Sequence, residues 1–415
     1  MGLLKKTLIA VGLLVLLKLI LVLLDKYSPL TILFHRNFIT ALQLVIFLWL
    51  IISIVIGLFI RKNPRTASRV TWILLILLVA GLELLFVYWF KNPGKAPASL
   101  FGSFKEYYIH NYRNIVQVER SCSEFDSTFF YRLKRNNQCT FSNLEFSSII
   151  KTNSLGLRDD EASMTAPDII CIGDSYTMGW GVEQDRAFPA VLERSTGLKV
   201  LNAGMSSFGT VRELRQLARL DTSNCKFVVL QYCDNDVQEI KPYVDSNFRL
   251  QTSDAASYDT LVKRSEWNHA YYPGKTLFSV GMFKLKSSIK SMMSKGKEEY
   301  FIPSGAVKVS VPESAKLFAE TLRRSADLFR NRTLVVLYAF EGGRKDTVFT
   351  NTLQQLLNTS PYREELNFRI IILNTSNMLD EKDSFIWDDH YNANGHAKIA
   401  AAIKNAIGQQ QQIPQ

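Results

Sequence analysis

Short apolar segments alternate with helical segments over the C-terminal part of the sequence, and this alternation most constrains the fold. The segments are rich in Val, Ile, Leu and Phe and lie at residues 168–172, 199–202, 226–232, 334–340 and 368–373. Such continuous apolar runs are typical of strands buried on both faces. Helices are expected at Thr210 to about Leu220, where Thr210 and Glu213 would form a capping box, and at Glu313–Asn331 and Asn394–Ile407. The pattern predicts an α/β fold with a mainly parallel sheet and helices on both faces.

Polar motifs follow these strands where each of them ends. A Gly-Asp-Ser175 motif follows the first strand, Gly204 follows the second, and Asn235 follows the third. Another motif, Asp388-Asp-His390, comes just before the last helix. Because ligands of open parallel sheets bind outside the carboxyl ends of the strands, we expect these residues to meet at one edge of the sheet.

These residue types suit nucleophilic catalysis by a serine. The Ser175 hydroxyl needs a base to remove its proton, and the His390 imidazole is such a base at neutral pH. Asp388 would hold the imidazole in the required tautomer. The backbone N–H groups of Ser175 and Gly204 and the Asn235 carboxamide would form an oxyanion hole, in which losing one donor costs about 2.7–4 kcal/mol. The alternatives are a tight turn at Gly204 and a strand-end cap at Asn235.

The motifs resemble the four blocks of the SGNH hydrolases, the superfamily of GDSL esterases and lipases. Gly-Asp-Ser175 matches the first block, Gly204 in Asn-Ala-Gly-Met the second, Asn235 followed by Asp the third, and His390 with its carboxylate the last. The resemblance covers roughly residues 150–407 in the family's order. It implies a flavodoxin-like three-layer α/β/α sandwich, no cofactor, and ester hydrolysis or acyl transfer through a serine acyl-enzyme.

The sequence departs from the family's pattern at two positions. Cys233 replaces the usual glycine of the third block, and Trp387 stands where the family has a carboxylate three residues before the histidine. Asp388 is the nearest candidate for that carboxylate, with Asp389 as its substitute. This closer spacing is similar to the ending of SGNH proteins of alginate O-acetylation.

The N-terminal part contains apolar runs at about residues 7–24, 38–60 and 70–90. A helix crosses the hydrocarbon core with about 20 apolar residues, so we expect three transmembrane helices. Lys5 and Lys6 precede the first run, and basic residues fill the loop at 61–69. Cytoplasmic loops carry such an excess, which predicts a multi-pass cell-membrane protein whose catalytic domain is extracytoplasmic. The alternatives for the first run are a signal peptide and a peripheral helix.

Charge and cysteine content limit the partners. The formal net charge is +11, and the first 90 residues hold nine Lys/Arg against two acidic residues, which leaves +4 for the body. This excess is too small to indicate a nucleic-acid partner. No cysteine or histidine spacing indicates a metal. Cys122 and Cys139 would face an oxidising compartment, so they form a disulfide or remain free.

Isolated polar residues receive structural roles. Lys18 and Glu83 lie at similar depths in the first and third apolar runs, so they either pair or extend to the interface. Arg158 is expected to form a structural ion pair rather than to bind an anionic substrate. His396 is expected to cap or flank the last helix rather than to join catalysis.

We divide the chain into a membrane domain (1–92), an N-terminal extension (93–150), a catalytic domain (151–408) and a disordered tail (409–415). An insertion at about 241–312 would shape the substrate site. The first hypothesis is a membrane-anchored esterase that acts on an acylated glycan or lipid. The second is an O-acyltransferase with the same residues and a separate acyl-donor membrane partner. The third is a binding or scaffold protein with a relic site.

Overall fold

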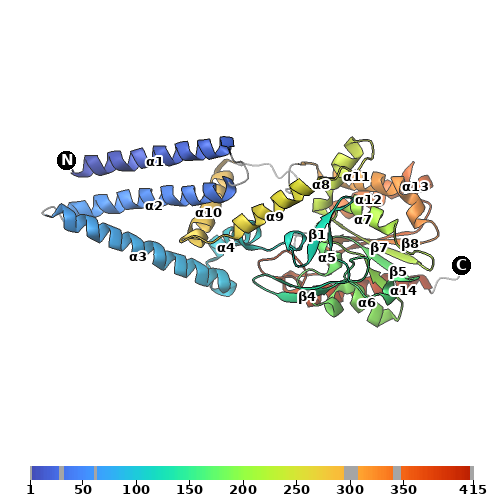
Figure 1. Cartoon of the computed structure of the whole chain (residues 1–415). Helices are drawn as coiled ribbons and strands as arrows, with labels where there is room; N and C mark the ends of the chain where they lie inside the picture. The colour runs from blue at the N-terminus through green and yellow to red at the C-terminus, as the bar shows by residue number, and fades with distance from the viewer. Residues whose placement is uncertain (1, 28–31, 60–62, 294–306, 340–346, 412–415) are drawn as a thin grey trace. The chain divides into compact units, whose positions relative to one another are not determined.

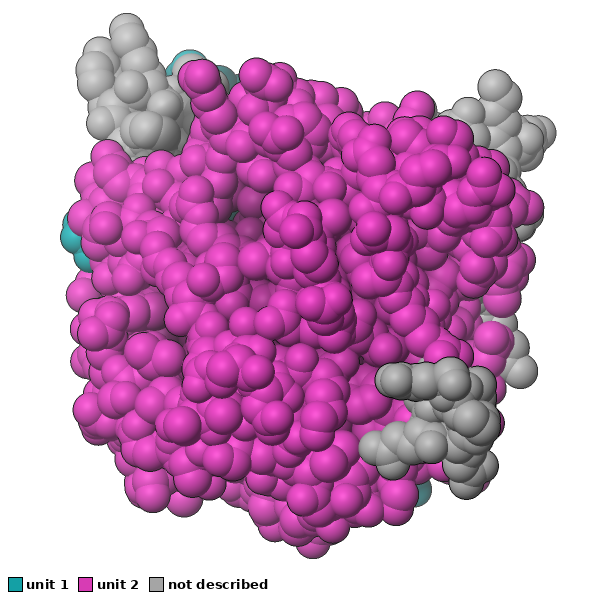
Figure 2. Space-filling model, turned by 90° about the vertical axis from the view of Figure 1, so that its right-hand side faces the viewer, with its two compact units in different colours: residues 1–113, 259–296 teal, residues 114–258, 297–415 magenta. Residues whose placement is uncertain are grey.

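The computed structural model describes residues 2–27, 32–59, 63–293, 307–339 and 347–411. The chain forms two compact units, coloured separately in Figure 2: residues 1–113 with 259–296, and residues 114–258 with 297–415. The segment expected as one insertion at 241–312 is therefore divided, because residues 259–296 cluster with the N-terminal part of the chain. The expected tail at 409–415 lies partly outside the described residues, and α14 continues to Gln411.

The first unit is helical (Figure 1). Its helices are α1 (Gly2–Tyr27), α2 (Ile32–Phe59), α3 (Pro64–Lys91), α4 (Ala98–Tyr107), the part of α9 (Ala255–His269) from Asp259 on, and α10 (Lys275–Met293). Within the described residues, one stretch, Arg65–Lys91 in α3, is long and apolar enough to cross a membrane. The apolar stretches of α1 and α2 are shorter there, at Leu8–Ile20 and Ala41–Ile56. Three membrane spans therefore stay a prediction.

Glu83 in α3 contacts α10 rather than Lys18. Its carboxylate is buried and accepts the backbone N–H groups of Thr276 at 3.1 Å and Leu277 at 2.8 Å. These N–H groups lie in the first turn of α10, where they have no acceptor within the helix and a negative charge is favoured. Lys18 is exposed on α1. The predicted Lys18–Glu83 pair is therefore wrong, because a helix remote in sequence supplies the partner.

The second unit contains a five-stranded parallel sheet in the order β6-β5-β7-β8-β9. The strands are β5 (Ile169–Ile172), β6 (Val200–Asn202), β7 (Phe227–Cys233), β8 (Thr333–Ala339) and β9 (Ile370–Asn374). Each lies within two residues of a predicted strand, so the expected α/β fold is confirmed. This strand order is that of flavodoxin-like doubly wound sheets, in which the order of strand addition reverses between β5 and β7.

Helices cover both faces of the sheet. These are α5 (Ser175–Met178), α6 (Phe188–Thr196), α7 (Thr210–Leu217), α8 (Val237–Asp245), α11 (Val311–Arg324), α12 (Val348–Leu357), α13 (Tyr362–Glu365) and α14 (Ala393–Gln411). Alternate side chains of β7 point to opposite faces. Val229 packs in one core with residues of α6 and α14. Tyr232 packs on the other face, with its ring 4.7 Å from Phe318 of α11 and 4.3 Å from Phe349 of α12. The sheet is thus the middle of three layers.

Two antiparallel hairpins precede the sheet. They consist of β1 (Ser123–Asp126) with β2 (Phe130–Leu133), and β3 (Gln138–Ser142) with β4 (Ser147–Lys151). A disulfide joins Cys122, directly before β1, to Cys139 in β3, which confirms the disulfide alternative. The disulfide links the two hairpins covalently and limits the movement of the turn between β3 and β4. This turn contributes a residue to the candidate site.

Candidate active site

Ser175 opens α5 at a tight turn directly after β5. Asp174 caps this short helix with its side chain. A Cβ on Gly173 would lie 2.1 Å from Thr177 Oγ1 and 2.6 Å from Gln231 Oε1, so only glycine fits. The buried Gln231 amide of β7 accepts the Asp174 N–H at 3.0 Å and the Thr177 hydroxyl at 3.1 Å. The turn that presents Ser175 is therefore tied to the central strand.

His390 lies between Ser175 and a buried carboxylate. Its Nε2 is 2.6 Å from Ser175 Oγ, and its Nδ1 is hydrogen-bonded to Asp388 Oδ1. The second Asp388 oxygen accepts the indole N–H of Trp180 at 3.1 Å. With Nδ1–H donated to Asp388, Nε2 is free to accept the serine proton. Of the two candidate carboxylates, Asp388 is the one on the imidazole, whereas the backbone carbonyl of Asp389 accepts the Tyr176 hydroxyl at 3.1 Å.

Aromatic rings fix the orientation of the His390 imidazole. Trp180 stacks on it with 4.7 Å between ring centroids and an interplanar angle of 18°, and Tyr176 lies 4.8 Å away. Rotation of the imidazole away from Ser175 would break these contacts. Sequence reasoning did not identify either aromatic residue. The only sequence signal for Tyr176 and Trp180 was their position within five residues of Ser175.

Glu145 anchors the backbone that carries Asp388. It lies in the β3–β4 turn and accepts three backbone N–H groups, from Ile386 at 2.7 Å and from Trp387 and Asp388 at 2.9 Å each. Burial raises the pKa of the Glu145 carboxyl, and the Asp388 charge adds to this, while the three hydrogen bonds act in the opposite direction. Sequence reasoning missed Glu145, because neither spacing nor periodicity links it to residues more than two hundred positions away.

Gly204 lies against α5, as the oxyanion-hole prediction requires. A Cβ at this position would be 2.4 Å from the Met178 backbone nitrogen, so any side chain would collide with α5. The Gly204 N–H donates to Asn202 Oδ1 at 3.1 Å and would have to exchange this acceptor for an oxyanion. The Ser175 N–H belongs to the first helical residue of α5, which has no acceptor within the helix.

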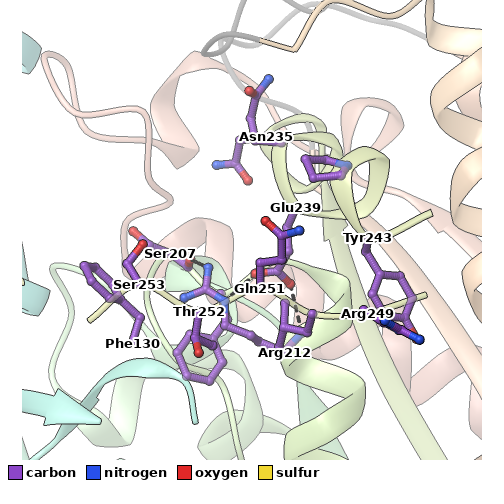
Figure 3. A pocket seen from close by; sticks show the side chains of 15 residues that line it. Phe130, Ser207, Arg212, Asn235, Glu239, Tyr243, Arg249, Gln251, Thr252 and Ser253 are labelled. Carbon is purple, nitrogen blue, oxygen red and sulfur yellow. Dashed lines mark hydrogen bonds and ion pairs between the residues drawn. The ribbon is translucent and has the colours of Figure 1, made fainter. Parts of the chain in front are cut away.

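Asn235 follows β7 in the 3-10 turn η6 (Asp234–Asp236) and reaches the same edge of the sheet. There it lines a pocket of about 590 Å³ (Figure 3). Of the five predicted site residues, Ser175, His390 and Asp388 are brought into direct contact. Gly204 lies beside their helix, and Asn235 stands at the next strand end. The sequence motifs therefore converge at one edge of the sheet.

A group of buried carboxyls lies near the serine turn. Glu213 of α7 and Asp236 are both about 1 % exposed, and the Thr210 hydroxyl donates to Asp236 Oδ2 at 2.7 Å. Burial, and then neighbouring carboxylates, raise the pKa of Glu213 and of Asp236 well above their usual values.

The predicted capping box of Thr210 and Glu213 is wrong. Gly209 is the N-cap of α7, and the Thr210 hydroxyl donates to Asp236 instead.

Arg158 supports the end of α5 through backbone carbonyls. Its buried guanidinium donates to the carbonyls of Gly179 at 2.5 Å, Val182 at 2.8 Å and Ile149 at 2.9 Å. Burial lowers the pKa of Arg158 to about 10. The prediction of an ion pair is wrong, because backbone carbonyl oxygens, and not a carboxylate, accept the hydrogen bonds of the guanidinium. Arg158 nevertheless has a structural role, as predicted.

His396 lies in the first turn of α14 and caps α6, whereas capping or flanking of the last helix was expected. Its Nδ1 accepts the backbone N–H of Phe188, the first residue of α6, at 3.2 Å. Burial lowers the pKa of His396 to about 3, and the charges of Arg158 and His390 act in the same direction. His396 is therefore a neutral helix-anchoring residue. Within the described part of the chain, no group of three or more His, Cys, Asp or Glu side chains has a metal-binding arrangement.

A hydroxyl, an imidazole and a carboxylate joined in series at the carboxyl edge of a parallel sheet form the arrangement found in serine hydrolases. No protein-family model and no curated protein matches the sequence. The chain is similar to solved structures of G-D-S-L family lipolytic proteins. The Veillonella parvula protein is 14 % identical with a TM-score of 0.32, and the match covers 59 % of this chain and 98 % of that one.

A G-D-S-L family protein from Desulfitobacterium hafniense is 13 % identical with a TM-score of 0.30, over 57 % of this chain and 97 % of the other. A carbohydrate esterase family 2 enzyme from Corynascus thermopiles is 10 % identical with a TM-score of 0.32, over 59 % of this chain and 66 % of the other. Because these TM-scores are low, the function is inferred from the residues and the geometry of the site.

Proposed function

We propose that this protein is a serine esterase that hydrolyses an O-acyl ester through an acyl-enzyme on Ser175. The observation that carries the proposal is the continuous chain of contacts from Ser175 Oγ to His390 Nε2, at 2.6 Å, and from His390 Nδ1 to Asp388. A serine hydroxyl gains a nucleophile's reactivity when a neighbouring base can take its proton. All three side chains are at least nine-tenths buried, so bulk water competes little for these bonds.

In the first step, Ser175 Oγ attacks the ester carbonyl carbon while His390 Nε2 takes the hydroxyl proton. The tetrahedral intermediate collapses as the carbon–oxygen bond to the alcohol breaks, and His390 returns the proton to the departing alcohol. A water molecule then attacks the acyl-enzyme with His390 again as base, which releases the carboxylic acid and restores Ser175. Asp388 stabilises the imidazolium in both steps.

We assign the stabilisation of the negative charge on the carbonyl oxygen to three donors. These are the Ser175 N–H, the Gly204 N–H and the Asn235 carboxamide. Donors of this kind stabilise the negative charge where it develops in the transition state. The close approach of Gly204 to the Met178 nitrogen supports its place beside the serine helix. In this assignment the oxyanion displaces the Asn202 side chain as acceptor of the Gly204 N–H.

We further propose that the enzyme is a multi-pass protein of the cell membrane with its catalytic unit outside the cytoplasm. Support comes from the apolar stretch Arg65–Lys91, the basic loop at 61–69 and the Cys122–Cys139 disulfide. Disulfides persist in oxidising compartments and are rare in the cytosol. An acetyl group on a cell-envelope glycan, or a lipid ester, is then the accessible substrate class.

An O-acyltransferase with the same acyl-enzyme is the second candidate, favoured by the similarity of the His390 motif to SGNH proteins of alginate O-acetylation. Its acceptor would be a sugar hydroxyl in place of water, and a separate membrane partner would supply the acyl group.

The test uses the full-length protein in detergent with a serine-directed phosphonate and p-nitrophenyl acetate. We expect the label on Ser175 and a loss of at least about 10³-fold in kcat for Ser175→Ala. The matched control Ser223→Ala, an exposed serine before β7, should keep both label and rate. A folded protein that carries no label on Ser175 would refute both enzyme functions and leave the binding role. Envelope glycan acylation that rises in cells carrying Ser175→Ala supports the esterase, and a fall supports the transferase.

A further inference from the structure

The pocket beside Asn235 is lined by polar and apolar side chains together. It has a volume of about 590 Å³ and is bounded by the loop after β6, helix α8 and the segment 249–253 (Figure 3). Its lining includes the hydroxyl or amide side chains of Ser207, Gln251, Thr252 and Ser253. Aromatic rings of Phe130 and Tyr243 also line it, and both residues are half-buried.

The backbone around this pocket is strained. Phe130 and Ser207, which both line it, have φ angles of +73° and +58°. Asn247 and Phe248, directly before the segment 249–253, have φ angles of +55° and +60°. A left-handed conformation is costly for residues with a side chain, and such strain gathers at ligand-binding positions. Two such residues in the lining, and two more directly before a lining segment, indicate that the walls are shaped for a ligand.

The polar wall is rigid before any ligand binds. Arg212 forms an ion pair with Glu239, and its guanidinium also donates to the Ser207 carbonyl at 2.5 Å and the Phe129 carbonyl at 3.3 Å. The Ser207 hydroxyl accepts the Gln117 amide at 2.9 Å. Because Arg212 and Glu239 neutralise one another, the remaining charge in the pocket lining is the exposed Arg249 guanidinium. Rigid walls lower the ordering cost of binding.

An alkyl chain would fit this pocket poorly. It would remove water from the Gln251 amide and the Ser253 hydroxyl without offering them hydrogen bonds, and each unmet group costs about 1–3 kcal/mol. A sugar ring has hydroxyl groups at its edge and carbon-bound hydrogens on its faces. The hydroxyl groups match the amide and hydroxyl side chains, and the faces match the rings of Phe130 and Tyr243.

We propose that this pocket binds the alcohol portion of the ester, and that this portion is a sugar ring. The proposal rests on the proposed serine esterase function, because Asn235 belongs both to the pocket and to the assigned oxyanion hole. It assigns substrate selection to Phe130 and Gln251, which are specificity residues outside the catalytic triad.

The experiment compares acetyl esters that differ only in the alcohol: methyl 6-O-acetyl-glucoside, p-nitrophenyl acetate and hexadecyl acetate. The full-length protein is assayed beside Phe130→Ala, Gln251→Ala and a control, Leu155→Ala, an exposed apolar residue outside the pocket. We expect Phe130→Ala and Gln251→Ala each to raise KM for the sugar ester about tenfold, while Leu155→Ala keeps it within twofold of wild type. The thermal unfolding midpoint of each variant shows whether it is folded.

An unchanged KM for the sugar ester in folded Phe130→Ala and Gln251→Ala, or a preference of the wild type for hexadecyl acetate, would overturn the proposal while leaving the esterase function intact. If no ester is turned over and Ser175 is not labelled, the esterase function itself fails. Saturation-transfer NMR with methyl glucoside then tests the pocket alone: binding lost in Phe130→Ala supports the sugar site, and no binding to wild type overturns it.

Discussion

Replacing Glu145 by Gln should slow the proposed reaction although Glu145 touches neither substrate nor imidazole. Its carboxylate accepts three backbone N–H groups of the segment 386–388 that carries Asp388. A glutamine side chain has one acceptor oxygen in place of two. In its better orientation this oxygen keeps the two bonds to Trp387 and Asp388, and the amide nitrogen then faces the Ile386 N–H.

The expected magnitude follows from the one lost bond. A hydrogen bond to a charged group contributes about 1.5–3 kcal/mol, and Ile386 is 51 % exposed, so water replaces part of it. We therefore expect the lower end, about 1.5 kcal/mol. If this loosens the Asp388 position in the transition state, kcat falls about tenfold, since each 1.36 kcal/mol of barrier is a factor of ten.

The assay measures kcat and KM for p-nitrophenyl acetate together with the thermal unfolding midpoint. Glu183→Gln is the matched control, because Glu183 accepts the Ile149 N–H at 3.3 Å without contacting the segment that carries Asp388. A positioning role predicts lower kcat at nearly unchanged KM in Glu145→Gln and wild-type kinetics in Glu183→Gln. The reasoning is refuted if Glu145→Gln keeps kcat within twofold of wild type, or if both variants lose rate equally.

Other perturbations test the parts around the site. Gly204→Ala should reduce kcat by at least tenfold and lower stability by about 1–3 kcal/mol, because its Cβ would meet the Met178 nitrogen; wild-type kinetics would contradict the oxyanion assignment. Replacing Cys122 and Cys139 by Ser should lower the unfolding free energy by about 3 kcal/mol, measured by chemical denaturation against the disulfide-bonded wild type, and an unchanged midpoint would count against it. His396 has a folded-state pKa of about 3, below its unfolded value near 6.5, so it destabilises the fold progressively as pH falls from 6.5 towards 3. His396→Gln should therefore flatten the fall of the melting midpoint over this range, and an equal slope in both proteins would argue against a buried neutral imidazole.

The parallel sheet was predictable because burial on both faces leaves a local record in the chain. Strands such as β7 must be apolar at every position, and this pattern survives in the sequence without knowledge of neighbours. Ser175 was predictable for a related reason, since it follows a strand and ligands bind at the carboxyl ends of parallel strands. His390 was predictable from its residue type, since an imidazole is a base at neutral pH and it stands in the motif Asp388-Asp-His390. The disulfide was left open between two alternatives, because spacing alone does not tell whether Cys122 and Cys139 approach each other.

The sequence by itself therefore determined the strands, the serine and the histidine of this protein, since apolar periodicity, strand-end position and a short motif such as Asp388-Asp-His390 are local properties of the chain. Only the tertiary structure decided which carboxylate supports His390, that Glu145 holds that carboxylate's backbone, and that Glu83 caps α10. These contacts join residues remote in sequence, or depend on the exact path of a loop. A hydrogen bond needs its atoms about 3 Å apart, and no property of either residue alone reports that distance.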